Sequence, residues 1–200
     1  MGIYFYLLIL TGIMTAVTLD NRGRLPLPKQ LQEQFGDRFR VVEHQSGIRL
    51  IPVAEDPLSA LRAEFEDVDK SVEELRGSDR EEDLNEAGPW MYAERDFVLA
   101  LIKAEDWLGE SAEAVYRTHR DELWTSQFTL IELLLVAYRE DLDTERVVAN
   151  AAELLEVRGN VDTVLAAASY VEQEGLAPFD ALHRIKSTGD PTVSSDNAHG

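Results

Sequence analysis

The chain has 200 residues, no cysteine, 38 acidic and 19 basic residues, and a formal net charge of −19. The lack of cysteine excludes disulfides, thiolate metal sites and cysteine nucleophiles, and it suits a reducing cytoplasm. The acidic balance is typical of proteins kept soluble in concentrated salt, as in halophiles, and it argues against a nucleic-acid binder that uses its whole surface.

The opening residues 1–13 are apolar but too few to span a bilayer, which needs about 20 apolar residues. We interpret them as an extension upstream of a natural start at Met14, with a signal peptide as the less favoured alternative. No membrane association is expected.

The block 14–53 has the pattern of a small β domain. The expected elements are a strand at 16–19, an edge strand at 24–28, a helix from Pro28 to about Phe35 and a hairpin of 39–43 with 48–52. Such short strands bury little surface alone, so we expect the unit to need a partner chain. With six basic and four acidic residues, this block is the part of the chain that can approach a phosphate backbone without a penalty.

The block 54–89 carries four basic and 13 acidic residues up to position 88, and its pattern predicts a helix from Asp56 to Glu86. Apolar residues recur every three or four positions along it: Leu58, Leu61, Phe65, Val68, Val72 and Leu75. This narrow apolar seam suits docking onto another surface. The run 85–89 contains strong breakers, and we place the domain boundary there.

From Trp90 to residue 200 strands alternate with helices, which predicts a parallel sheet covered on both faces. The expected strands are 90–93, 123–125 and 192–194, and the expected helices are 96–103, 111–120, 128–138, 144–156, 162–174 and 178–187. Trp107 and Trp124 are expected in the core. Ligands of such sheets gather beyond the carboxyl ends of the strands.

The segment Val17–Pro28, closed by Ile48–Pro52, resembles the AbrB/MazE/SpoVT family of swapped-hairpin domains over about residues 15–53. The resemblance implies an intertwined homodimer that presents arginines to operator DNA. Arginine suits both guanine and phosphate contacts. We expect Arg22 and Arg24 to contact DNA, with Asn21 and Lys29 as helpers; ordinary turn and surface charges are the alternative.

About residues 91–200 resemble the PIN nuclease superfamily in the form used by VapC-type toxins. The matching segments are Met91–Leu101, Thr125–Leu133, Ala177–His183 and Val193–Asp196. The resemblance implies an α/β/α domain that cleaves RNA with Mg²⁺ or Mn²⁺. Clustered carboxylates are tolerable around a hard divalent cation, which prefers oxygen ligands. The candidate catalytic residues are Glu94, Glu132, Asp180 and Asp196, and the candidate metal ligands are these four with Asp96.

Two of these acids have a simpler explanation than catalysis, and a third differs from the residue that the family has at its position. Asp180 could simply occupy the first turn of a helix, where negative charge is favourable, and Asp196 could be a turn residue. Glu94 stands where the family has aspartate, and Arg95 stands where it has a small hydroxyl residue. Arg95 could therefore neutralise the site or displace the metal. Glu132 is the strongest candidate, because it interrupts an apolar run and so needs a partner or a metal.

The two resemblances together describe an antitoxin and a toxin fused in one chain, as if two adjacent reading frames had joined before Met91. Antitoxins of this type end in a helix that blocks the toxin's acidic groove. The apolar seam is the candidate for that helix, with Arg62, Arg76 or Arg80 reaching the carboxylates in cis or across the dimer. The alternative is a DNA-binding regulator whose degenerate PIN domain serves only as an interaction platform.

Overall fold

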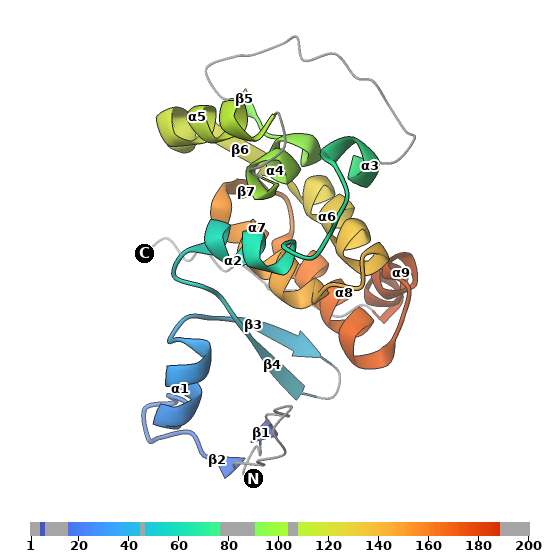
Figure 1. The fold of residues 1–200 in the computed structure, drawn as a ribbon. Coiled ribbons are helices and arrows are strands. Elements are labelled where there is room, and N and C mark those ends of the chain that lie inside the picture. The colour runs from blue at the N-terminus through green and yellow to red at the C-terminus, as the bar shows by residue number, and fades with distance from the viewer. Residues whose placement is uncertain (1–4, 7–15, 45–46, 77–90, 104–107, 189–200) are drawn as a thin grey trace, which may run out of the picture.

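The computed structural model describes residues 5–6, 16–44, 47–76, 91–103 and 108–188 (Figure 1). It is a mixed α/β structure with small antiparallel pairs and one parallel sheet. The strands are β1 (Phe5–Tyr6), β2 (Ala16–Val17), β3 (Phe39–His44), β4 (Gly47–Pro52), β5 (Met91–Tyr92), β6 (Leu123–Ser126) and β7 (Glu156–Arg158). The helices are α1 (Lys29–Phe35), α2 (Pro57–Glu64), α3 (Val72–Arg76), α4 (Arg95–Ile102), α5 (Gly109–His119), a 3-10 turn η1 (Arg120–Glu122), α6 (Gln127–Arg139), α7 (Thr144–Leu154), α8 (Val161–Glu174) and α9 (Pro178–Thr188).

The N-terminal part agrees with the predicted helix and hairpin and differs at one predicted strand. Helix α1 and the β3–β4 hairpin lie where the pattern predicts them. The predicted edge strand at 24–28 is wrong, because no ladder forms there. Pro26 and Pro28 lack the N–H group that a ladder needs. The backbone of β1, within the expected extension, pairs antiparallel with β2.

The hairpin packs on the helices of its own chain. One face of the hairpin buries Val42 and Ile51, and Val53 follows just after it. These side chains join the same hydrophobic cluster as the C-terminal helices, with β3 against α8 and β4 against α7. Figure 1 shows the hairpin beneath these helices, on the side away from β5–β7. The hairpin therefore obtains its core from residues more than 90 positions further along the chain.

The acidic block is not the single helix that the pattern predicts. Helix α2 ends at Glu64, where Phe65 begins a turn, and α3 starts only at Val72. Asp56 caps α2 through its bond with the Ser59 amide, and Pro57 occupies the first turn. The break occurs because the apolar seam bends around a globular surface. Residues 77–86, also predicted helical, lie outside the described residues, as does the predicted boundary at 85–89.

The apolar seam is buried along its whole length. Leu61, Phe65 and Leu75 are fully covered, Val68 and Val72 are buried, and Leu58 packs against the cluster. Helix α2 contacts α7 and α4, and α3 contacts α4. Full burial of each large apolar side chain contributes about 1.5–3 kcal/mol. The apolar seam is thus part of the hydrophobic core of the same chain.

The parallel sheet has the order β5-β6-β7, with β6 in the centre. Strand β7 was not predicted, because three residues are too few to show a strand period; its first residue, Glu156, was assigned to the end of the helix 144–156. Along β6 the side chains alternate between buried and partly exposed positions. This alternation leaves one sheet face accessible among the described residues, where the pattern had predicted helices on both faces. The predicted strand 192–194 lies outside the described residues.

None of the helices in the described ranges is long and apolar enough to cross a membrane.

Candidate active site

The first two acids follow directly from strand β5. The Ala93 amide donates to the Trp124 carbonyl at 2.7 Å, and the Thr125 hydroxyl donates to the Ala93 carbonyl at 2.6 Å. These bonds fix the chain at the end of β5 against β6. Glu94 is then the N-cap residue of α4, and its side chain makes no capping bond. Asp96 lies in the first turn of α4, where the helix dipole favours a negative charge.

The third acid enters from the neighbouring strand. Helix α6 begins at Gln127, immediately after β6, and carries Glu132 in its second turn. The Glu132 side chain is 47% exposed, and its Oε1 lies 4.0 Å from a guanidinium nitrogen of Arg95. Arg95 also contacts the Asp96 carboxylate at 3.2 Å. Arg95 therefore stands between acids from two strands, at the carboxyl edge of the sheet.

The electrostatics show that these acids act on one another. Partial burial raises the pKa of the Glu132 carboxyl above its usual value; the Arg95 guanidinium opposes that shift, and the charges of Asp96 and Glu94 add to it. Neighbouring negative charge disfavours ionisation of Glu132, so the cluster has more negative charge than Arg95 neutralises. This is the electrostatic condition under which a further cation is attracted.

A glycine just after β7 allows the chain to pass close to the start of α6. Gly159 has φ of +114°, and a Cβ there would lie 2.6 Å from Gln127 Oε1. The same oxygen accepts the Asn160 amide at 2.6 Å. Asn160 in turn caps α8 through the Thr163 amide. The starts of α6 and α8 are thereby joined beside the acids.

The remaining predicted acids are not brought into this cluster by the described structure. Asp180 lies exposed in the first turn of α9, and the charges that shift Glu132 do not include it. Asp196 lies outside the described residues. Over the described part of the chain, no three acidic or histidine side chains are gathered closely enough to hold a metal ion. The structure thus brings Asp96 and Glu132 to one arginine and places Glu94 near enough to act on the charge of Glu132, with no such link to Asp180.

The candidate DNA-binding residues lie on an exposed turn. Asp20 accepts the amides of Arg22 at 2.9 Å and Arg24 at 2.8 Å, and Gly23 closes the turn with φ of +74°. The Arg24 guanidinium pairs with Asp20 at 2.7 Å, and bonding to Arg24 lowers the pKa of that carboxyl. Asn21 and Arg22 are exposed, as is Lys29, which pairs with Glu33 at 3.2 Å. Arg22 is therefore freer than Arg24 to reach a ligand.

The predicted contact of the acidic block with the carboxylates does not occur at Arg62. Its guanidinium donates to the Leu101 carbonyl at 3.0 Å and pairs with Glu113 at 3.1 Å. Leu101 is at the C-terminal end of α4, whereas Glu94 and Asp96 are at its start. The side chains of Arg76 and Arg80 lie outside the described residues.

Residues of the acidic block also contact the C-terminal end of α6. Arg139 donates to the Leu75 carbonyl at 2.7 Å, and Lys70 pairs with Glu140 at 2.6 Å. Helices α2 and α3 therefore bind the ends of α4 and α6 that are remote from the acids, because the apolar seam fits the core there.

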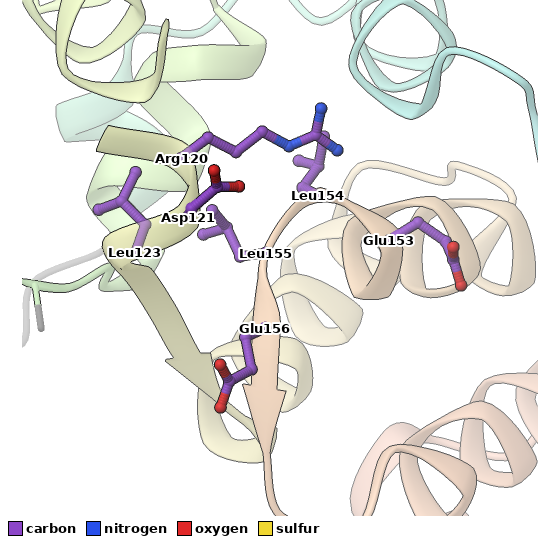
Figure 2. Close-up of a pocket in the computed structure, with 7 residues that line it drawn as sticks. All are labelled: Arg120, Asp121, Leu123, Glu153, Leu154, Leu155 and Glu156. Atoms are coloured by element: carbon purple, nitrogen blue, oxygen red, sulfur yellow. The ribbon is translucent and has the colours of Figure 1, made fainter. Parts of the chain in front are cut away.

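A pocket of about 310 Å³ lies at the opposite, amino edge of the sheet (Figure 2). Its lining includes Leu123 and Glu156, which begin β6 and β7, and the Arg120 side chain extends across it towards Leu154. Ligands of parallel sheets gather at the carboxyl edge, so we place the chemistry at the acids rather than in this pocket.

A second set of acids joins the hairpin to the helices, and its members were not among the predicted site residues. Buried Glu145 accepts Arg49 at 2.5 Å and the Ser169 hydroxyl at 2.5 Å. Burial raises the pKa of Glu145, while Ser169 and Arg49 oppose the shift. Glu153 pairs with Arg38 at 2.6 Å and also with Arg40. The unused signal was the excess of arginine on one face of the hairpin.

Comparison of the chain with protein-family models, with curated proteins and with solved structures finds no match.

Proposed function

We propose that this chain is a fused antitoxin–toxin protein, in which the N-terminal part binds operator DNA and the C-terminal part is a metal-dependent endoribonuclease. One observation carries the nuclease half: at the carboxyl edge of a parallel sheet the Arg95 guanidinium lies against both Asp96 and Glu132, and the charge of Glu94 also acts on Glu132. An excess of carboxylates at that edge is what a cation-assisted hydrolase needs. The resemblance to PIN nucleases at the same residues supports the assignment.

The donor set suits Mg²⁺ or Mn²⁺ by its chemistry, because all three groups offer carboxylate oxygens. Such an ion supplies activation of a water molecule for in-line attack on a phosphodiester. Glu94 lies at the start of α4, which follows β5, and Glu132 lies on α6, which follows β6. The two therefore come to the site from different elements, and Asp96 adds charge from the first turn of α4. Asp196, which lies outside the described residues, remains a candidate that completes the set.

Arg95 is the restraint that we propose for this site. Its guanidinium lies where it neutralises Asp96 and Glu132, and it must move away before these groups can hold a divalent ion. We do not propose that the apolar seam restrains the site. Residues 57–76 bind the ends of α4 and α6 that lie away from the acids. The seam contributes to the core instead, so a fragment starting at Met91 is expected to lose its fold rather than to become more active.

Manganese titration with an RNA cleavage assay tests the nuclease half. We expect the full chain to bind Mn²⁺ and to cleave RNA, and Glu132→Gln to abolish both while the fold is kept. Glu66→Gln is the matched control, because Glu66 is an exposed acid in the turn after α2. Loss of about 100-fold or more in cleavage is expected for a group that holds the catalytic ion. Equal activity of Glu132→Gln and the parent would contradict the proposal.

The DNA-binding half predicts a homodimer formed by the outer face of the hairpin. On that face Val41 is 61% exposed and Ile48 is 45% exposed, and Leu50 is the cross-strand partner of Val41. An apolar sheet face of this kind is typically covered by another chain. We expect Val41→Asp to give a monomer in sedimentation equilibrium and to weaken binding to the DNA upstream of the gene. A dimer that survives this substitution would place the interface elsewhere.

Arg22→Ala is the direct test of DNA contact, with Lys29→Ala as the weaker companion. Each lost phosphate contact should also make the slope of the logarithm of the binding constant against the logarithm of the salt concentration shallower by about one.

The alternative is a DNA-binding regulator with a non-catalytic C-terminal platform. It is favoured by the ion pairs that Arg95 makes with Asp96 and Glu132. It is also favoured because no three possible metal ligands are gathered among the described residues. Mn²⁺ titration separates the two: no binding to the parent or to Arg95→Ser favours the platform.

A further inference from the structure

Three planar side chains lie in a row across the parallel sheet, one on each strand. Tyr92 on β5 is the cross-strand partner of Trp124 on β6, and their ring centroids are 4.7 Å apart at a tilt of 45°. The Arg158 guanidinium on β7 lies 4.0 Å from the centre of the Trp124 ring. We call Tyr92, Trp124 and Arg158 the planar row.

The planar row lies on the accessible face of the sheet. Tyr92 is 41% exposed, and the Arg158 side chain is 46% exposed; Trp124 is partly buried between them, although the sequence had suggested a core position. The Tyr92 hydroxyl is held by the hydroxyls of Ser126 at 3.0 Å and Thr129 at 3.1 Å. The ring is thus fixed in place yet open to solvent.

A further exposed aromatic, Phe128, lies on α6, the helix that carries Glu132. Phe128 is 67% exposed in the first turn of α6, and Glu132 is one turn further along on the same side of that helix. Side chains four apart on a helix are neighbours, so Phe128 flanks the candidate active site. Phe128 therefore offers an exposed ring beside the acids.

We propose that the planar row and Phe128 stack the unpaired bases of an RNA strand whose backbone reaches the acids. The inference rests on the proposed nuclease function and assigns the side chains that contact the bases of its substrate. Unpaired bases stack on aromatic rings and on arginine planes, whereas the bases of a duplex have their faces covered. Arg158 also pairs with Glu156 at 3.5 Å, and 46% of its side chain is exposed, so part of the guanidinium faces solvent.

The charge of the chain makes this mode of binding distinctive. A protein with a net charge of −19 cannot attract RNA through its general field. Stacking releases few counterions, so binding should weaken only slightly as salt rises, in contrast to the steep loss that phosphate-dominated binding shows.

Fluorescence anisotropy with full-length protein and 5′-fluorescein-labelled decauridylate and decaadenylate tests the inference. The measurement is made in EDTA and again with Ca²⁺, so that affinity is read without requiring cleavage. We expect Tyr92→Ala and Phe128→Ala each to weaken binding roughly fivefold or more, as for one lost stacking contact. Tyr92→Phe and Phe128→Tyr keep a ring and should bind nearly as the parent does. Tyr138→Ala is the matched control, because Tyr138 is 46% exposed at the other end of α6.

The outcomes separate the inference from the function on which it rests. If Glu132→Gln abolishes cleavage while Tyr92→Ala and Phe128→Ala bind both oligonucleotides as tightly as the parent, the stacking surface is wrong and the nuclease stands. If the alanine variants lose binding and the parent cleaves nothing, the surface stands and the nuclease fails. No binding in either buffer, or equal binding of duplex RNA, overturns the inference.

Discussion

Two groups of carboxylates in this protein meet arginines, and they are balanced in opposite ways. At the contact between hairpin and helices, Glu145 and Glu153 face three guanidiniums, those of Arg38, Arg40 and Arg49. At the carboxyl edge of the sheet, Arg95 lies against both Asp96 and Glu132, and the negative charge of Glu94 acts on Glu132 as well.

The difference distinguishes acids that hold a fold together from acids kept for a ligand. Glu145 is buried and satisfied by Arg49 and Ser169, which is the arrangement that makes a buried charge tolerable. Glu132 is half exposed, and its neighbours raise its pKa further. An unbalanced, accessible group of this kind is a candidate functional site.

The largest difference is expected when each group loses its arginine. Arg49→Met leaves Glu145 buried without a cation and should lower the free energy of unfolding by about 2–4 kcal/mol. Arg95→Met should change it by less than about 1 kcal/mol, because water still reaches Glu132. Urea denaturation of both variants measures the contrast. Equal losses would mean that both groups are structural.

Metal affinity should respond to Arg95 and not to Arg49. Arg95→Ser removes a positive charge from the site and should tighten Mn²⁺ binding about tenfold, as expected for one charge near the surface. Arg49→Lys keeps the charge at the contact between hairpin and helices and is the control. Titration calorimetry checks this, and an unchanged affinity in Arg95→Ser would remove Arg95 from the site.

Loss of a serine hydroxyl should cost more stability beside buried Glu145 than at the sheet edge. Ser169→Ala removes a hydrogen bond to buried Glu145 and should cost about 1 kcal/mol of stability, or somewhat more because the acceptor is charged. Ser126→Ala at the sheet edge should cost close to nothing, since Ser126 is partly exposed and its bond is with the Tyr92 hydroxyl. Thermal unfolding of the two variants is the measurement.

The smallest effect is expected in the pH dependence of stability. Because the folded pKa of Glu132 is raised above its ordinary value of 4.5, the folded state takes up a proton before the unfolded state does. The contribution of Glu132 to stability therefore rises as pH falls from 7 through the raised pKa, and it is complete below 4.5. Glu132→Gln should remove part of this rise, whereas Glu66→Gln should not. Unfolding midpoints across this range test it, and identical slopes in all three proteins would contradict it.

Local chemistry determined much of the secondary structure from the sequence alone. The hairpin β3–β4 follows from its alternating residues, and helices α6 and α8 follow from their apolar periods and, in α8, from the Asn160 cap. These signals lie within a few residues of the elements they specify, so no tertiary contact is needed to find them. The adjacency of Glu94 and Glu132 could also be predicted, because each follows a strand of one parallel sheet.

Only the tertiary structure decided which partners these elements have. The acidic block reads as one long amphipathic helix, but it breaks at Phe65 because a curved core buries Leu61 and Leu75 on two different helices. Pairings such as Arg49 with Glu145, 96 residues apart, and the exposed row through Trp124 depend on how strands and helices meet in space. Charge pairing and burial over such separations leave no local period in the sequence.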